Sequence, residues 1–237
     1  MQKLSTNQPQ TATYTELIER LTPEATLTLR GVSWETYEDL LEALGEAPAL
    51  RISYDEGVVQ IMTISFEHEF FAECINHFVG LVRTVMRIKI ISFGRATMKK
   101  QEKLKGAEPD ACYYVKSAAA LGNKFRLDLQ TDPPPDIVVE TDVYHDSQSK
   151  FPIYAALGVP EIWRFDGKRL AIHRLQNDQY VESPRSEQLP ILTGEILTQF
   201  LDRAQEEDQD EALRAFEDWL REQASTRPLP SATDPAV

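Results

Sequence analysis

The sequence predicts an α/β fold in which a mixed β-sheet is flanked by helices, with two further helices at its C-terminal end. Three observations support this class: short β-prone runs separated by hairpin-turn signals, one long segment with helical periodicity, and an uninterrupted apolar strand followed by a short helix. Strands joined partly by hairpins and partly through helices give a sheet with antiparallel and parallel neighbours.

The chain divides into one folded unit and two terminal segments. Residues 1–12 are rich in Gln and Thr and are expected to be disordered. Residues 13–225 are expected to form a single domain, because 42% of the 237 residues are hydrophobic, which is enough for one large core. Residues 226–237 form a Pro-rich tail that cannot build a packed element.

The first hairpin and the longest helix follow each other in the N-terminal half. Two β-prone runs, Leu50–Tyr54 and Val58–Ile64, flank Asp55-Glu56-Gly57, a sequence typical of hairpin turns. Apolar residues then recur at spacings of three and four, so residues 67–86 are expected to form an amphipathic helix. Ser65 stands where the N-cap of this helix would be.

Four further strands are expected before the next helix. Residues 88–93 form one, and Gly94 separates it from a second strand that extends to about Met98. Residues 111–115 form the third. The fourth, at 137–139, is continuously apolar, which is typical of a strand that is covered on both faces.

The remaining chain alternates between helices and strands. A short helix over about residues 149–157 ends at Gly158. A second hairpin signal, Asp166-Gly167, separates strands at 161–165 and 169–174. Two amphipathic helices close the domain, and their apolar positions are Ile196, Leu197, Phe200 and Leu201 in the first and Leu213, Phe216, Trp219 and Leu220 in the second.

Cysteine content and hydropathy favour a soluble cytoplasmic protein. The two cysteines, Cys74 and Cys112, lie inside apolar patterns and indicate buried free thiols rather than a disulfide framework. No apolar run approaches the roughly 20 residues needed to span a membrane.

The net charge of −13 argues against a surface that is basic overall, which nucleic-acid-binding proteins usually present. A local basic patch could still exist just before Asp110. Its members would be Arg95, Lys99, Lys100, Lys103 and Lys105. The alternative is that this stretch is an ordinary solvated loop or hairpin.

Two acidic residues occupy strand positions where apolar side chains are expected. Asp110 stands at the entry of the strand at 111–115, and Glu140 ends the apolar run at 137–139. A buried carboxylate is costly unless it is paired, hydrogen-bonded or bound to a cation. Two carboxylates at adjacent strand ends could share a hard divalent cation whose bound water attacks a phosphodiester. The alternative is that both are surface residues that cap backbone amides.

Three segments, in order along the chain, resemble one family. They are Glu108–Val115, Pro134–Glu140 and Ile153–Arg164. Together they resemble the Uma-two family of endonucleases, common in cyanobacteria and similar to the PD-(D/E)XK nuclease superfamily. The resemblance covers about residues 33–200. It implies a restriction-endonuclease-like core and Mg²⁺- or Mn²⁺-dependent hydrolysis of DNA.

The resemblance also implies roles for individual residues. Asp110 matches the metal-ligating aspartate of the first superfamily motif, and Glu140 matches the acidic member of the (D/E)XK element. Two residues later, where a lysine is expected, this chain has Asp142. In the family pattern a lysine appears at the start of the following helix, which corresponds to Lys150. That side chain could reach back to the metal site, or it could be an ordinary solvated lysine.

A further candidate lies at the start of the long helix. Glu67 is four and seven residues before Phe71 and Cys74, so it shares their inward face. The family resemblance places a Glu-His pair at Glu67-His68. Glu67 could support the metal, directly or through water, or it could favour the helix N-terminus by its charge. His68 could be a base, a ligand or a structural residue.

The leading hypothesis is therefore a metal-dependent endonuclease. Asp110 and Glu140 would hold Mg²⁺ or Mn²⁺, Lys150 would assist, and Glu67 would support the site. Attack by a metal-activated water would hydrolyse DNA without a covalent intermediate.

Two other hypotheses remain open. A catalytically silent nuclease-fold protein that acts as an interaction or regulatory module is favoured by the acidic charge and by Asp142 in place of the lysine. An enzyme acting on RNA or on a small substrate would suffer less from repulsion. Phe200 and Trp219 are expected to be exposed and could serve a homodimer.

Overall fold

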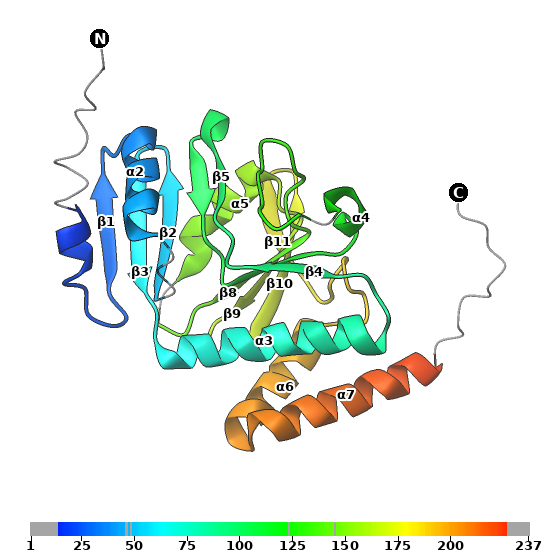
Figure 1. Ribbon diagram of the computed structural model, residues 1–237. Helices are drawn as coiled ribbons and strands as arrows, with labels where there is room; N and C mark the ends of the chain where they lie inside the picture. The colour runs from blue at the N-terminus through cyan, green and yellow to red at the C-terminus, as the bar shows by residue number, and fades with distance from the viewer. Residues whose placement is uncertain (1–13, 46, 48, 123, 145, 227–237) are drawn as a thin grey trace, which may run out of the picture.

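The computed structural model confirms the α/β class, but its strands form two sheets instead of one (Figure 1). The described residues are 14–45, 47, 49–122, 124–144 and 146–226. Of the two terminal segments, residues 1–12 and 227–237 therefore lie outside the described residues.

A five-stranded antiparallel sheet forms from the N-terminal half of the chain. Its strands, in their order across the sheet, are β1 (Thr26–Arg30), β3 (Val58–Thr63), β2 (Leu50–Asp55), β6 (Lys105–Ala107) and β5 (Met98–Lys100). The hairpin between β2 and β3 is as predicted, and its turn uses Gly57 at φ 93°. Helix α2 (Trp34–Leu44) covers this sheet, and a short 3₁₀ turn, η1 (Gln101–Lys103), joins β5 to β6.

The second sheet has six strands. In order they are β11 (Gln179–Ser183), β10 (Leu170–Gln176), β9 (Glu161–Phe165), β8 (Ile137–Thr141), β7 (Ala111–Tyr114) and β4 (Ile91–Gly94). Only β8 and β9 are parallel neighbours. The chain passes between them through η2 (Ser147–Lys150) and α5 (Phe151–Leu157), and α5 ends at Gly158 in the left-handed conformation, as predicted.

Two strand positions differ from the sequence prediction. β4 begins at Ile91. Arg87 has a left-handed backbone conformation, with φ 54°, just after the long helix, and the residues from there to Ile90 form the connection to the strand. The next strand begins at Met98, where it was expected to end, and Met98 pairs with Ala107 in the other sheet. The segment between Gly94 and Met98 therefore carries the chain from one sheet to the other.

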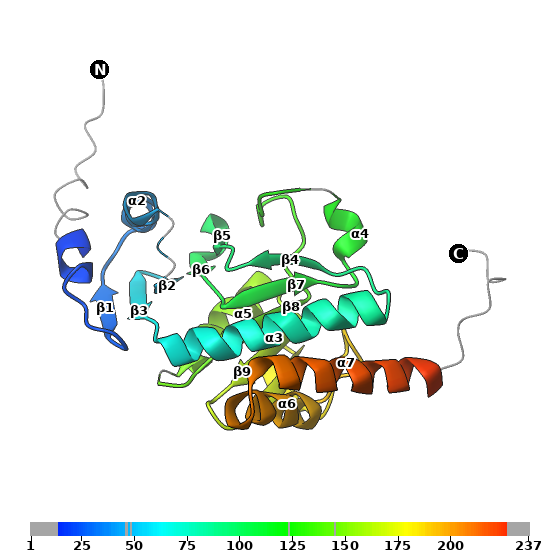
Figure 2. The ribbon, with the colours of Figure 1, turned by 60° about the horizontal axis from the view of Figure 1, so that its bottom comes forward.

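Three helices cover one face of the six-stranded sheet. They are α3 (Phe66–Val85), α6 (Gly194–Glu206) and α7 (Gln209–Thr226), and Figure 2 shows α7 alongside α3. The main apolar core lies between them and the sheet, while α5 packs against the opposite face. A single turn, α4 (Ala118–Leu121), follows β7. No described helix is long and apolar enough to cross a membrane.

The C-terminal helices correct one expectation, that Phe200 is exposed. Only Glu207 and Asp208 separate α6 from α7. Phe200 is only 7% exposed and packs against Phe78 and Phe216 in the core. It is therefore not available for a dimer interface, and Trp219 is half-buried beside it.

Candidate active site

The candidate site lies where the chain passes from the five-stranded to the six-stranded sheet. β6 ends at Ala107, and β7 begins at Ala111 in the other sheet. Ala111 pairs with Val139 of β8, and the Asp110 amide donates to the Val139 carbonyl at 3.0 Å. Because the strands are antiparallel, the entry of β7 lies beside the end of β8, which brings Asp110 next to Glu140.

Asp110 is held by three donors from separate parts of the chain. Its Oδ1 accepts from Arg51 Nε at 2.8 Å, and its Oδ2 accepts from the Thr141 amide at 2.7 Å and lies 3.0 Å from His68 Nε2. Burial alone would raise the pKa of Asp110. The hydrogen bond and charge of His68 and the charges of Arg51 and Lys150 outweigh burial and hold this pKa well below its usual range. Asp110 is therefore ionised at neutral pH.

Glu140 and Lys150 form a buried ion pair. Lys150 Nζ donates to Glu140 Oε2 at 2.8 Å and to the Glu108 carbonyl at 3.3 Å, and Tyr154 donates to Glu140 Oε1. Burial raises the pKa of Glu140; the Lys150 charge opposes this rise, and the Asp110 charge adds to it. Glu140 therefore takes up a proton more readily than an exposed glutamate.

Burial excludes the surface alternatives for these three residues. Asp110 is 5% exposed, Glu140 is 2% exposed and Lys150 is 1% exposed. Asp110 does bind a backbone amide, as that alternative supposed, but inside the protein. The sequence-predicted trio thus converges at one buried position.

Asp142 helps to explain how Lys150, which is further along the chain than the lysine of the superfamily motif, lies in the carboxylate cluster. Its Oδ2 accepts from the Ser147 amide at 3.0 Å and from the Ser147 hydroxyl at 2.9 Å, and it pairs with Arg164 of β9. These contacts fix the start of η2, and Lys150 is the last residue of that turn. The aspartate in the usual lysine position therefore anchors the segment that supplies the lysine.

Glu67 does not join the carboxylate cluster through any contact of the described residues. It accepts from the Tyr144 hydroxyl at 2.6 Å and lies in the first turn of α3, which fits a role at the helix N-terminus. Its neighbour His68 contacts Asp110 instead. Glu69 then contacts Arg51 at 3.1 Å and also pairs with Arg95.

Arg51 is the main site residue that sequence reasoning missed. In β2 the apolar Leu50, Ile52 and Tyr54 alternate with Arg51 and Ser53, a pattern typical of a strand with one face toward solvent. Arg51 is instead buried beside Asp110. Arg51 could have been recognised as a site residue only if β2 were known to lie next to the second sheet, and the sequence does not reveal that arrangement.

The donor set fits a hard divalent cation. Magnesium prefers oxygen ligands and keeps several waters. A carboxylate oxygen has two acceptor positions, and only Oδ2 of Asp110 has both occupied by described residues. His68 Nδ1 and Thr141 Oγ1 are buried with no hydrogen-bond partner among the described residues, so both atoms could still bind water or another ligand. The described residues contain no ready-made group of three His, Cys, Asp or Glu ligands, so Asp110 and Glu140 would hold the ion together with water.

The basic stretch before Asp110 is largely neutralised within the protein. Lys99 pairs with Glu38 at 2.8 Å, Lys100 pairs with Glu102 at 3.0 Å, and Lys105 and Arg95 pair with further carboxylates. Most of these residues lie in the hairpin of β5 and β6. This favours the charged-hairpin alternative over a strongly basic patch.

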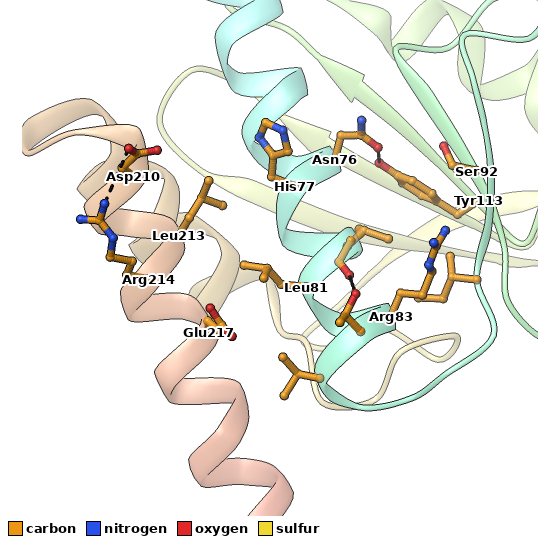
Figure 3. Close-up of a pocket in the computed structure, with 15 residues that line it drawn as sticks. Asn76, His77, Leu81, Arg83, Ser92, Tyr113, Asp210, Leu213, Arg214 and Glu217 are labelled. Atoms are coloured by element: carbon orange, nitrogen blue, oxygen red, sulfur yellow. Dashed lines mark hydrogen bonds and ion pairs between the residues drawn. The ribbon is translucent and has the colours of Figure 1, made fainter.

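Two cavities bear on the choice of site. One of about 490 Å³ is lined in part by Arg51, Arg95, Thr97 and Glu108, and two of these, Arg51 and Glu108, contact the carboxylate cluster. Another, of about 620 Å³, is a groove between α3 and α7 whose walls include Leu81 (Figure 3). The lining of this groove contains neither the clustered residues nor their hydrogen-bond partners, whereas Arg51 and Glu108 of the first cavity contact Asp110 and Lys150, so the chemistry of the chain points to the first cavity.

The site thus combines two buried carboxylates and a buried lysine where the two sheets meet. Residues 34–204 match the model of the Uma2 family, described as "Putative restriction endonuclease". The chain belongs to this family, and that membership supports a nuclease.

A solved structure is also similar. It is described as a putative nuclease belonging to DUF820 from Anabaena variabilis ATCC 29413, with 18% sequence identity and a TM-score of 0.48. The match covers 69% of this chain and 97% of that one. No curated protein matches the chain significantly.

Proposed function

We propose that this protein is a metal-dependent endonuclease that hydrolyses phosphodiester bonds of DNA. The observation that carries the proposal is the 2.8 Å contact between Lys150 Nζ and Glu140 Oε2, buried beside Asp110. A buried ion pair is weak evidence for stability, because desolvation offsets most of its attraction. Its place beside a second carboxylate, in a member of an endonuclease family, favours a catalytic role.

Each residue has a distinct role in this proposal. Asp110 and Glu140 would hold Mg²⁺ or Mn²⁺, and the bound ion would polarise the phosphoryl group and lower the pKa of its water. Asp110 needs no proton release to bind a cation, because its pKa is already low. Lys150 would stabilise the negative charge that develops on the phosphoryl oxygens during hydrolysis. His68 and Arg51 keep the Asp110 carboxylate oriented.

One observation favours a second candidate, a catalytically silent interaction module. All four oxygens of Asp110 and Glu140 have protein donors, two of which belong to Arg51 and Lys150. The cluster can therefore hold together without an ion. This candidate predicts neither divalent-metal binding nor DNA cleavage.

The deciding experiment is cleavage of plasmid and single-stranded DNA with Mg²⁺ or Mn²⁺ at low salt. Wild type would be compared with Glu140→Gln and with Glu161→Gln. Glu161 is also a buried glutamate of the same sheet, but it binds Ser186 and Trp163 outside the cluster. We expect the Glu140 variant to lose at least about a hundredfold in rate, the scale for losing one charge-stabilising group, while Glu161→Gln remains active.

The other outcomes are equally informative. Equal cleavage by wild type and Glu140→Gln would assign the activity to a contaminant or to another site. No cleavage by any protein on either substrate, with folding verified by circular dichroism, would favour the silent module.

A further inference from the structure

A carboxylate bridges two arginines at the entrance of the candidate site. Glu69 Oε1 lies 3.1 Å from Arg51 Nη2, and Glu69 Oε2 contacts Arg95 Nη2. The side chain of Glu69 is 29% exposed and that of Arg95 is 32% exposed, whereas Arg51 is buried. The bridge therefore extends from solvent inward to the arginine that binds Asp110.

The same two arginines line the cavity of about 490 Å³. Its wall also includes Glu108, whose carbonyl accepts from Lys150. Arg51 uses Nε for Asp110 and Nη2 for Glu69, so a group in the position of Glu69 would lie one guanidinium away from the carboxylate cluster. The cavity is therefore bordered by two residues, Arg51 and Glu108, that contact Asp110 and Lys150.

The chemistry of the bridge suits a phosphate group. Guanidinium groups bind carboxylates and phosphates with the same planar, paired N–H geometry. A phosphodiester has one negative charge shared by two oxygens on one atom, as a carboxylate does, and could replace Glu69 between the two arginines. Because one anion would replace another between the two arginines, the charge that faces these arginines would be unchanged, despite the overall charge of −13.

We propose that Arg51 and Arg95 form the binding subsite for a backbone phosphate of DNA next to the scissile bond, and that Glu69 occupies this subsite until DNA binds. The proposal rests on the proposed function, since it assigns a substrate contact to the same site. It makes Arg95 and Glu69 substrate-binding and gating residues rather than structural ones.

The test measures binding without cleavage. Fluorescence anisotropy of a labelled DNA duplex, with EDTA present, would be compared for wild type, Glu69→Gln, Arg95→Gln and the double variant. Glu73→Gln is the matched control, since it removes the same charge one turn further along α3, at an exposed position. We expect Glu69→Gln to bind roughly fivefold more tightly and Arg95→Gln to bind roughly fivefold more weakly. The double variant should not show the tighter DNA binding of Glu69→Gln, and Glu73→Gln should bind DNA with nearly wild-type affinity.

Salt dependence gives a second readout. Arg95→Gln should lower the slope of log affinity against log salt by about 0.9, the value for one lost phosphate contact. Equal gains in Glu69→Gln and Glu73→Gln would reduce the effect to net charge and overturn the subsite. Wild-type affinity in Arg95→Gln, or no DNA binding by any variant at low salt, would also overturn it. Binding in the expected order in EDTA, together with no cleavage in the separate assay with Mg²⁺ or Mn²⁺, would retain the phosphate-binding subsite and contradict the nuclease proposal.

Discussion

At the scale of single residues, the two neighbouring carboxylates have opposite acid–base behaviour. Both are buried, and burial alone raises the pKa of each. Asp110 overcomes this with the hydrogen bond and charge of His68 and the charges of Arg51 and Lys150, so its pKa is lowered. Glu140 has Lys150 and Tyr154 but also the repulsion of Asp110, so its pKa is raised. Asp110 thus remains a charged anchor, while the charge of Glu140 depends on conditions.

The raised pKa of Glu140 predicts a pH effect on stability. A carboxyl whose pKa is higher in the folded state binds more protons there, so the free energy of unfolding falls as pH rises between the two pKa values. In EDTA, wild type should therefore lose stability relative to Glu140→Gln as pH rises above about 4.3, the unfolded value for glutamate. Urea unfolding of both proteins across this range measures the difference. A wild-type free energy of unfolding that stays constant or rises with pH relative to that of Glu140→Gln would contradict the shift.

The ion pair itself predicts strong coupling between Glu140 and Lys150. Lys150→Met removes one partner of a buried pair, which typically costs about 3–5 kcal/mol because the other charge is left uncompensated. Adding Glu140→Gln to Lys150→Met should therefore recover part of the lost stability. Urea unfolding of the two single variants and the double variant gives the coupling energy. Additive effects would show that the two side chains do not interact in solution.

Residue-scale prediction from sequence depended on how conspicuous each residue was. Asp110 and Glu140 stood out because they border apolar strands, and Lys150 was found through the family pattern. Arg51 and Glu69 did not stand out. Their importance arises from contacts across two sheets and a helix, which strand alternation alone cannot reveal.

At the scale of elements, the first turn of α3 organises one side of the site. His68 contacts Asp110 from this turn, and Glu69 contacts both Arg51 and Arg95. The turn is held by Ser65, whose hydroxyl accepts from the His68 amide at 3.2 Å. A loss of order at this helix end would therefore weaken the contacts of His68 and Glu69 with Asp110 and Arg51.

Removal of this cap tests the role of the element. Ser65→Ala should cost about 1 kcal/mol of stability, the usual value of an N-cap, and Ser65→Asp should restore most of it. If His68 depends on the cap to orient Asp110, Ser65→Ala should also lower cleavage, measured well below its unfolding temperature. Thr193→Ala at the cap of α6, away from the site, is the control and should affect stability alone. Equal loss of cleavage in both variants would contradict a specific role for the first turn of α3.

Local elements were predictable because their causes are local. The periodicity of α3, the turn at Gly57 and the left-handed end of α5 at Gly158 each follow from a few adjacent residues. The division into two sheets was not predictable in this way. It depends on β2 pairing with β6, about fifty residues later, and on Met98 joining the first sheet rather than the second.

At the scale of the whole molecule, the acidic charge and the proposed substrate must be reconciled. A net charge of −13 repels DNA at long range. Four of the five cations before Asp110 are already paired with carboxylates. Any affinity for DNA must therefore come from a few contacts at the site, together with a divalent ion that offsets the repulsion between the cluster and a phosphate.

Metal binding should accordingly stabilise the entire domain. An ion that binds only the folded state raises the free energy of unfolding by about 2.7 kcal/mol at a hundredfold excess over its dissociation constant. Thermal unfolding with Mn²⁺ or Mg²⁺, against an EDTA baseline, should therefore show a higher midpoint for wild type and a much smaller shift for Asp110→Asn. Asp136→Asn is the matched control, because Asp136 is also buried but binds the Val115 and Ser117 amides outside the cluster. It should keep the full metal-induced shift, whatever its own stability. The same shift in Asp110→Asn as in wild type would place the ion elsewhere, and no shift in wild type would mean that Arg51 and Lys150 satisfy the carboxylates without any metal.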